Sequence, residues 1–461
     1  MLESSSGSGS EVESDAEPIA ESGAQSGDAP GVELSSTGRP LPQRWLATVV
    51  VIWLGQAFSI ITSYSAGYAS IWYFTETTNS AFMLSVATIV SILPTGLLSP
   101  LGGLLADRFN RRTIMLVSDA IVGLASLVLG IIIYSGYISL ALLLVMVFIR
   151  AVAQAFHTPA LTAAMPLMVP QRHLVRINSL SQMLWGFAGI GAPVLGIFLY
   201  NAIGFYSVMF LDVLGAALAC GGLLLVRIPT VHDENMENQR FLHNLLDGWR
   251  VIYHNRGLFL FMLMSTLAML LFMPIGAMFP LMTYQHFGPQ FNNDPVTLGY
   301  MASLVEAVWG ICMLVGSLAL MAWGGGKRHV RLVLITGVII SLTIAGCGLL
   351  RPGQFVGFAV LTGIMAIVVA FYNGPMITVI QNNSPEEKMG RVMGLFGSLM
   401  SLTSPVGLVI AGLIAEQTGV ALWFLISGVI MAVLAVLMFF IKPIRDLDFV
   451  ARGADEGTSA L

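Results

Sequence analysis

The sequence has little charge. Only 10% of its 461 residues are Asp, Glu, Lys or Arg, compared with about a quarter in a typical soluble domain. So few charges cannot cover a water-exposed surface, while 56% of the residues are hydrophobic and the mean hydropathy is +0.82. This composition excludes an ordinary soluble protein and indicates that lipid surrounds most of the chain.

Cysteine is also scarce. The three cysteines all lie in apolar runs, at Cys220, Cys312 and Cys347, and their spacing excludes both a disulfide framework and a metal-ligand pattern. The sequence shows no nucleotide-binding loop and no nucleophile–base pairing. We therefore expect no enzymatic activity, no cofactor, no metal and no nucleic-acid partner.

The amino-terminal segment 1–43 is rich in Ser, Gly and acidic residues. Residues 1–38 contain eight acidic side chains and neither Lys nor Arg. Such a segment cannot bury enough apolar area to offset its ordering entropy, so it is predicted to be a disordered tail. It lacks a basic start followed by an apolar core, so it does not resemble a signal peptide.

The rest of the chain predicts an all-α membrane protein. A membrane-spanning helix needs about 20 apolar residues. Twelve segments satisfy this criterion: 46–73, 81–104, 113–134, 138–168, 177–199, 206–226, 257–283, 299–323, 331–350, 354–381, 392–415 and 421–441.

The basic residues orient these twelve segments. With the amino terminus inside, the inner loops and tails hold 19 of the 21 basic residues, leaving Arg351 outside and Arg150 within a span. Cytoplasmic loops collect Lys and Arg. The sequence therefore predicts a multi-pass protein of the cell (plasma) membrane with both termini in the cytoplasm.

The spans form two halves that resemble each other. A polar linker, 227–256, separates a six-helix half at 44–226 from a second at 257–441, and 442–461 forms a cytoplasmic tail. Residues 155–180 align with 370–395 at an offset of 215. An internal six-helix repeat is typical of transporters whose halves rock around a central cavity.

The loop between the second and third spans reads Gly103-Leu-Leu-Ala-Asp107-Arg108-Phe-Asn110-Arg111-Arg112. It resembles the signature G-x-x-x-D-R-x-G-R-R of the major facilitator superfamily. The one departure is Asn110 in place of glycine, which we expect to be mild because Asn tolerates a left-handed turn. The corresponding loop of the second half keeps the basic pair Lys327–Arg328 but has Trp323 where the acid would stand.

Within the superfamily, "RAVAQAFHTPALTAAMPLMVP" and "LVEAVWGICMLVGSLAL" resemble the macrolide-efflux type of drug:proton antiporter. The resemblance implies a monomer whose partners are a small-molecule substrate, protons and the lipid bilayer, with the proton gradient as energy source. It also implies that Asp107 latches the halves against the eleventh helix, with Gly103 permitting the close approach. We expect Arg111 and Arg112 to pair with Asp119.

The fifth span contains "GFAGIGAPVLG" at 186–196, which resembles the antiporter signature of glycines around a G-P pair, except that Ala192 replaces one glycine. Gly189 and Gly196 would let another helix approach, and Pro193 would bend the span. Ordinary small-residue packing is the alternative.

Ionisable residues within the spans are costly, at least about 2.5–3.5 kcal/mol each at the bilayer centre. Glu306 is placed to carry protons, or lies near a wet outer mouth. Arg150 resembles the superfamily arginine implicated in proton transfer, or forms a buried pair. Asp212 is a further candidate for proton transfer, or has a structural role because its helix is expected at the periphery. His157 is either a proton relay or a hydrogen-bonding residue near Pro159.

The cavity is expected to be lined by the first, fourth, seventh and tenth spans, as the resemblance implies. Candidate lining residues are Trp53, Tyr64, Met269, Phe272, Phe371, Tyr372 and Asn373. Such adaptable side chains suit varied hydrophobic ligands, and packing between helices is the alternative. The predicted function is proton-driven export of hydrophobic or amphiphilic compounds. The alternative is a dedicated exporter or importer of one natural solute, such as a siderophore, bile acid or sugar.

Overall fold

The computed structural model is all-helical across its described residues, which are 45–226, 253, 255–326, 328–385 and 389–448. The predicted tail 1–43, most of the linker 227–256 and the end of the tail 442–461 lie outside this part of the chain. Side chains such as those of Asp107 and Arg391 are likewise not described.

Eleven of the twelve predicted segments each fall on a single helix, and the segment 257–283 covers more than one. The first half consists of α1 (Trp45–Thr78), α2 (Ala81–Arg108), α3 (Arg111–Tyr134), α4 (Leu140–Met168), α5 (Gln171–Ala202) and α6 (Phe205–Leu225). The second half consists of α8 (Arg256–Ala277), α9 (Phe279–Leu281), the π-helix η1 (Met282–His286), the 3₁₀-helix η2 (Gly288–Phe291), α10 (Pro295–Trp323), α11 (His329–Leu349), α12 (Phe355–Asn382), α13 (Met389–Thr418), α14 (Val420–Phe440) and α15 (Lys442–Arg445).

Among the described residues, eleven helices are long and apolar enough to cross a membrane. The remaining long helix, α5, has a shorter apolar segment, Gly186–Ala202. The protein is therefore a multi-pass, all-helical membrane protein.

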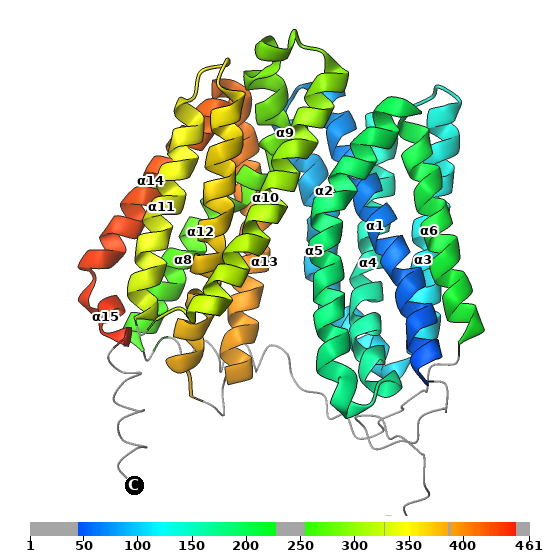
Figure 1. Ribbon diagram of the computed structural model, residues 1–461, viewed down its shortest axis with the longest axis horizontal. Helices are drawn as coiled ribbons and strands as arrows, with labels where there is room; N and C mark the ends of the chain where they lie inside the picture. The colour runs from blue at the N-terminus through cyan, green and yellow to red at the C-terminus, as the bar shows by residue number, and fades with distance from the viewer. Residues whose placement is uncertain (1–44, 227–252, 254, 327, 386–388, 449–461) are drawn as a thin grey trace, which may run out of the picture.

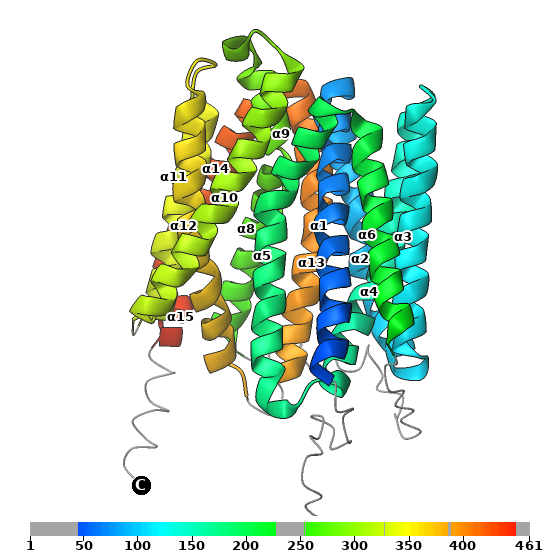
Figure 2. The ribbon, with the colours of Figure 1, turned by 45° about the vertical axis from the view of Figure 1, so that its right-hand side comes forward.

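The helices form two groups, α1–α6 and α8–α14 (Figure 1). We call the end where α6 finishes and α8 begins the linker side, and the opposite end the loop side. In Figure 1 the two groups meet at the loop side and diverge toward the linker side. Across the halves, α2 packs against α13 and α5 packs against α10. Figure 2 shows α5 and α13 where the two groups border each other.

Hydrogen bonds fasten the halves together at the loop side. The Glu416 Oε2 atom on α13 accepts from Ser80 Oγ at 2.9 Å and from Phe82 N at 3.1 Å, at the start of α2. Gln285 Nε2 donates to the Asn79 carbonyl at 2.8 Å. The halves are thus joined where the α1–α2 turn meets the second half.

A hydrophobic plug lies just inside these hydrogen bonds. It consists of Tyr68 and Trp72 of α1, Ile197 of α5, and Leu298 and Ala302 of α10, all buried. The Trp72 ring meets Tyr284 edge-on, with 5.9 Å between centroids. Side chains from both halves therefore close the space between them at the loop side.

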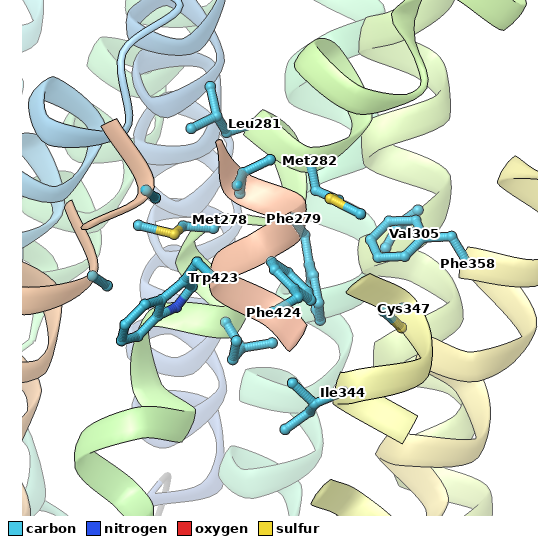
Figure 3. Packing of buried hydrophobic residues seen from close by; sticks show 14 of the residues in the cluster. Met278, Phe279, Leu281, Met282, Val305, Ile344, Cys347, Phe358, Trp423 and Phe424 are labelled. Carbon is cyan, nitrogen blue, oxygen red and sulfur yellow. The ribbon is translucent and has the colours of Figure 1, made fainter. Parts of the chain in front are cut away.

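The predicted span 257–283 is interrupted. α8 ends at Ala277, and α9 and η1 follow after Met278. Pro274, which lacks a backbone donor, lies in the last turn of α8. Phe279 then packs against Phe358 of α12 and Phe424 of α14, with ring centroids 5.9 and 6.2 Å away. Figure 3 shows Phe279, Phe358 and Phe424 together in this buried cluster.

Side chains cap several helices. Asn110 has an extended backbone, and its side chain accepts from Arg112 N at 3.0 Å, at the start of α3. Asn110 therefore acts as a capping residue and does not use the left-handed conformation that it would tolerate. Asp294 caps α10, and the hydrogen bonds from the Thr297 hydroxyl and backbone lower the pKa of the Asp294 carboxyl.

We predict that Glu416→Ala shifts the protein away from the state joined at the loop side. An exposed carboxylate at a helix amino terminus contributes about 0.5–1 kcal/mol, so the population ratio should change about two- to fivefold. Distances between spin labels on the loop-side ends of α2 and α13 measure this ratio. Gln417→Ala, next to it and exposed, is the control, and equal distributions in both variants would contradict the prediction.

Candidate functional site: a buried ion pair beside a central cavity

A single carboxylate connects four helices of the first half. Asp212 of α6 is completely buried and forms an ion pair with Arg150 of α4. Its Oδ1 atom accepts from Ser63 Oγ at 2.6 Å and Thr62 Oγ1 at 3.3 Å on α1, and its Oδ2 atom from Ser126 Oγ on α3 at 2.6 Å. A buried charge is tolerated when it is paired and its remaining lone pairs are hydrogen-bonded.

This network gives Asp212 a structural role. Its side chain points from α6 into the bundle, toward α1, α3 and α4. Arg150 also donates to Ser126 and to the Ser63 carbonyl. Of the two interpretations of Arg150, the structure shows the buried pair, which cancels the charge that the arginine brings to the cavity wall.

A cavity of about 670 Å³ lies between the halves. Drug-sized ligand sites range from about 300 to 1,000 Å³. The first half supplies Tyr64, Tyr68, Arg150 and Gln154, among others, and the break after α8 contributes Gly276, Ala277 and Pro280. The wall is completed by residues of α10 and α13, including Glu306, Trp309, Ser404 and Leu408.

Glu306 is the acidic residue of this wall. No hydrogen bond or ion pair reaches its carboxyl group from the described residues, and it lies close enough to Tyr68 for an electrostatic interaction. The Tyr68 hydroxyl is itself buried without a hydrogen-bond partner in the described structure. An ionised carboxylate without a partner inside a membrane span is strongly unfavourable, so this geometry favours the protonated form.

The predicted cavity residues separate into three groups. Tyr64 lines the central cavity. Met269, Phe272, Tyr372 and Asn373 instead border a cavity of about 40 Å³ within the second half. The other two lie elsewhere: Trp53 packs on the buried cluster around Met115, and the Phe371 ring is tilted against Trp323 with centroids 6.1 Å apart.

The loop between α2 and α3 differs from expectation. The Arg111 side chain donates to the carbonyls of Ala106 and Ala163, at 3.0 and 3.1 Å. Arg112 donates to the Leu223 and Leu224 carbonyls at the end of α6, at 2.7 and 2.8 Å.

Asp119 is bound by other groups. It accepts from Gln56 Nε2 at 2.9 Å and lies 3.3 Å from His157 Nε2. The expected pairing of Asp119 with Arg111 and Arg112 is therefore wrong, because backbone carbonyls at the ends of neighbouring helices take up the guanidinium groups. Arg108 is exposed, and the Asp107 side chain lies outside the described residues.

The glycines have different environments. A Cβ atom on Gly196 would lie 2.7 Å from the Ser65 carbonyl oxygen, so α5 and α1 pack closely there, as the sequence predicts. Gly189 and Gly103 face open space, and Gly189 lines the cavity with Pro193. The close approach of α2 to α4 is made at Gly102, where a Cβ atom would come within 3.2 Å of Phe156 Cα.

Sequence reasoning missed the hydroxyl groups around Asp212 and the cavity residue Trp309. A search for Ser and Thr at the depth of the intramembrane charges would have found Ser63 and Ser126. Trp309 carries no comparable pattern in a chain that is apolar throughout.

We predict that Asp212→Asn destabilises the protein by about 3–5 kcal/mol, because it leaves the buried Arg150 charge without its partner. The combined change Asp212→Leu and Arg150→Met should recover most of this loss, since it removes both charges. Denaturant unfolding of the purified protein in detergent measures the difference. A double variant no more stable than the single one would show that the pair does not act through charge compensation.

Comparison with known proteins adds to this geometry. The sequence profile of the Major Facilitator Superfamily matches residues 52–328 and 290–458. The chain is 37% identical to macrolide efflux protein A of Streptococcus pyogenes, over 88% of this chain and 98% of the relative. It is 36% identical to macrolide efflux protein A of Enterococcus faecalis, over 71% and 99%. The multidrug efflux pump Tap of Mycolicibacterium fortuitum is 24% identical over 83% and 92%.

Solved structures share the fold. A peptide transporter POT in complex with sulfate aligns with a TM-score of 0.66 and 13% identity, covering 87% of this chain and 95% of that one. A bacterial homologue of the human lysosomal transporter Spinster aligns with a TM-score of 0.63 and 14% identity, covering 88% and 97%. At these identities the likeness concerns the fold alone. By the profile match and the identity to its relatives, the chain belongs to the Major Facilitator Superfamily, among the transporters related to macrolide efflux protein A.

Proposed function

We propose that the protein is a twelve-span exporter that moves hydrophobic or amphiphilic compounds, macrolides among them, out of the cell in exchange for protons. The observation that carries the proposal is the Glu306 carboxyl, unpaired among the described residues, in a cavity of about 670 Å³ between two six-helix halves. The names of the relatives support the substrate class, and aromatic residues such as Tyr64, Tyr68 and Trp309 suit it.

The linker side is assigned to the cytoplasm. The α2–α3 and α10–α11 turns and α15 all lie at this end, and they carry Arg108, Arg111, Arg112, Arg328, Arg331, Lys442 and Arg445. Both termini are then cytoplasmic, and α5 serves as the twelfth span. Because the halves are joined at the loop side, the conformation described here opens toward the cytoplasm.

Proton exchange follows from the electrostatics of the cavity. Asp212 cancels the charge of Arg150, so the Arg150 guanidinium does not hold Glu306 in its ionised form. With the cavity empty, Glu306 keeps a proton. When a substrate brings positive charge or displaces the proton, Glu306 releases its proton to the cytoplasm. Rocking of the halves then exposes the substrate to the outside, where it leaves. Glu306 next takes up a proton from outside, and the halves return to the conformation that is open to the cytoplasm.

We predict that Glu306→Gln abolishes proton-driven transport but retains ligand binding, because Gln keeps the shape of the protonated acid and has no proton to exchange. Proteoliposomes with an imposed pH gradient and a radiolabelled macrolide measure the loss, which should exceed about tenfold. Glu76→Gln is the control, since Glu76 lies near the loop side and accepts from Tyr200 at 2.8 Å. Full gradient-driven transport by Glu306→Gln would refute its role in coupling.

Asp107 is proposed to act in the opposite conformation. The linker-side ends of α2 and α13 belong to the halves that diverge in Figure 1. When these ends approach, the carboxylate can cap the amino terminus of α13 and hold the cytoplasmic side closed.

We predict that Asp107→Asn lowers the transport rate and enriches the cytoplasm-open state, as seen by spin-label distances across the linker side. Arg108→Gln tests whether the loss of any charge in the loop has this effect. An unchanged rate and distance distribution in Asp107→Asn at normal expression would exclude the latch.

A further inference from the structure

A second buried polar cluster lies in the first half, outside the cavity wall. It consists of Gln56 of α1, Asp119 of α3 and His157 of α4, which are 3%, 6% and 5% exposed. Gln56 Nε2 donates to Asp119 Oδ2 at 2.9 Å, and His157 Nε2 lies 3.3 Å from Asp119 Oδ1. Three helices therefore converge on one carboxyl group.

This cluster repeats the register of the Arg150–Asp212 site. Gln56, Asp119 and His157 each lie seven residues toward the linker side of Ser63, Ser126 and Arg150 respectively. Seven residues are two helical turns, about 10 Å along each axis. The same faces of α1, α3 and α4 thus carry two polar layers, one near the middle of the bundle and one closer to the linker side.

The two layers differ in charge balance. In the first layer, the permanently charged Arg150 compensates Asp212. In the second layer, Asp119 has a cationic partner only when His157 is protonated. Imidazole is the side chain whose charge ordinarily changes between about pH 5 and 8, so this layer, unlike the first, has no permanent cation among the described residues.

Among the described side chains, the neighbouring elements give Asp119 no ion-pair partner besides His157. Arg111 and Arg112 of α3 donate to backbone carbonyls, and Arg150 pairs with Asp212. On α6 the facing titratable group is the Cys220 thiol, which contacts the Leu116 carbonyl at 3.8 Å.

The helices α2 and α5 also provide no counter-charge for Asp119 among their described side chains. Among the described side chains of α2 and α5, Arg108 is exposed at the end of its helix and His173 stacks on Trp45.

Two atoms of the cluster lack hydrogen-bond partners in the described structure, Gln56 Oε1 and the His157 Nε2 atom that approaches Asp119 without hydrogen-bond alignment. Buried polar atoms are rarely left unsatisfied. The cluster is thus incompletely closed in this state, which leaves room for a proton to bind and draw the imidazole onto the carboxylate.

We propose that Asp119 and His157 form a proton-binding site of their own, whose occupancy fastens α4 to α1 and α3 on the linker side. The proton comes from water at that side and is held between the imidazole and the carboxylate, with no other bond made or broken. Because α4 also carries Arg150 and Gln154 on the cavity wall, release of this proton loosens one wall of the cavity independently of Glu306.

The test is a pH titration of the full-length protein in lipid nanodiscs, with spin labels at positions 46 on α1 and 162 on α4, both exposed, in a variant without native cysteines. The wild type should show a narrow distance distribution near about pH 6 and a broader one near about pH 8. His157→Asn should lose this dependence. Asp119→Asn should also lose the narrow distribution near about pH 6, because the protonated imidazole then has no carboxylate to bind.

Two controls separate this site from others. His286→Asn removes a histidine bonded to the Leu350 carbonyl at 2.7 Å and should keep the transition, as should Glu306→Gln. If His157→Asn does not fold, the distance distribution of Asp119→Asn provides the test in its place. A transition absent from the wild type, or retained in His157→Asn, would overturn the proposal. Loss of the transition in Glu306→Gln would assign it to the cavity acid instead.

Discussion

The ion pair between Asp212 and Arg150 is the constraint on which the rest of the site depends. One carboxylate accepts hydrogen bonds from α1 and α3 and pairs with α4, so it fixes how three helices pack around α6. It also sets the charge of the cavity. An uncompensated arginine on this wall would favour an ionised Glu306 across the cavity, whereas a neutral pair leaves the glutamate with no partner among the described residues and therefore ready to hold a proton.

The hydrophobic plug lies next to Glu306. Tyr68 belongs both to the plug and to the cavity, and Ala302 of the plug lies one turn from Glu306 on α10. The carboxyl group is thus next to the layer that must part for the loop side to open. Its protonation state and the closure of that layer affect the same few contacts between α1 and α10. In the proposed mechanism, this proximity is the physical link between proton exchange and rocking of the halves.

The sequence predicted the helices well and the site only in part. Apolar runs separated by charged turns place all twelve segments, and the cost of intramembrane charge is enough to single out Glu306, Arg150, Asp212 and Asp119. Their partners were not predictable, because Asp212 meets Ser63 and Ser126 through packing of helices distant in sequence. The sequence also did not show which face of each helix lines a cavity. Met269, Phe272 and Tyr372 lie on helices that are apolar all round, so no periodicity shows that they face a small cavity within the second half.

The number of protons released when a macrolide binds to the purified protein in detergent near neutral pH tests most directly whether Glu306 is the exchanging acid. Calorimetry in buffers of different ionisation enthalpy gives this number without any need for a membrane gradient. If Glu306 exchanges the proton, the wild type should release up to about one proton per ligand. Glu306→Gln should release none, although it should still bind the macrolide. Equal proton release from both proteins, or none from the wild type, would contradict the assignment of Glu306 as the exchanging acid.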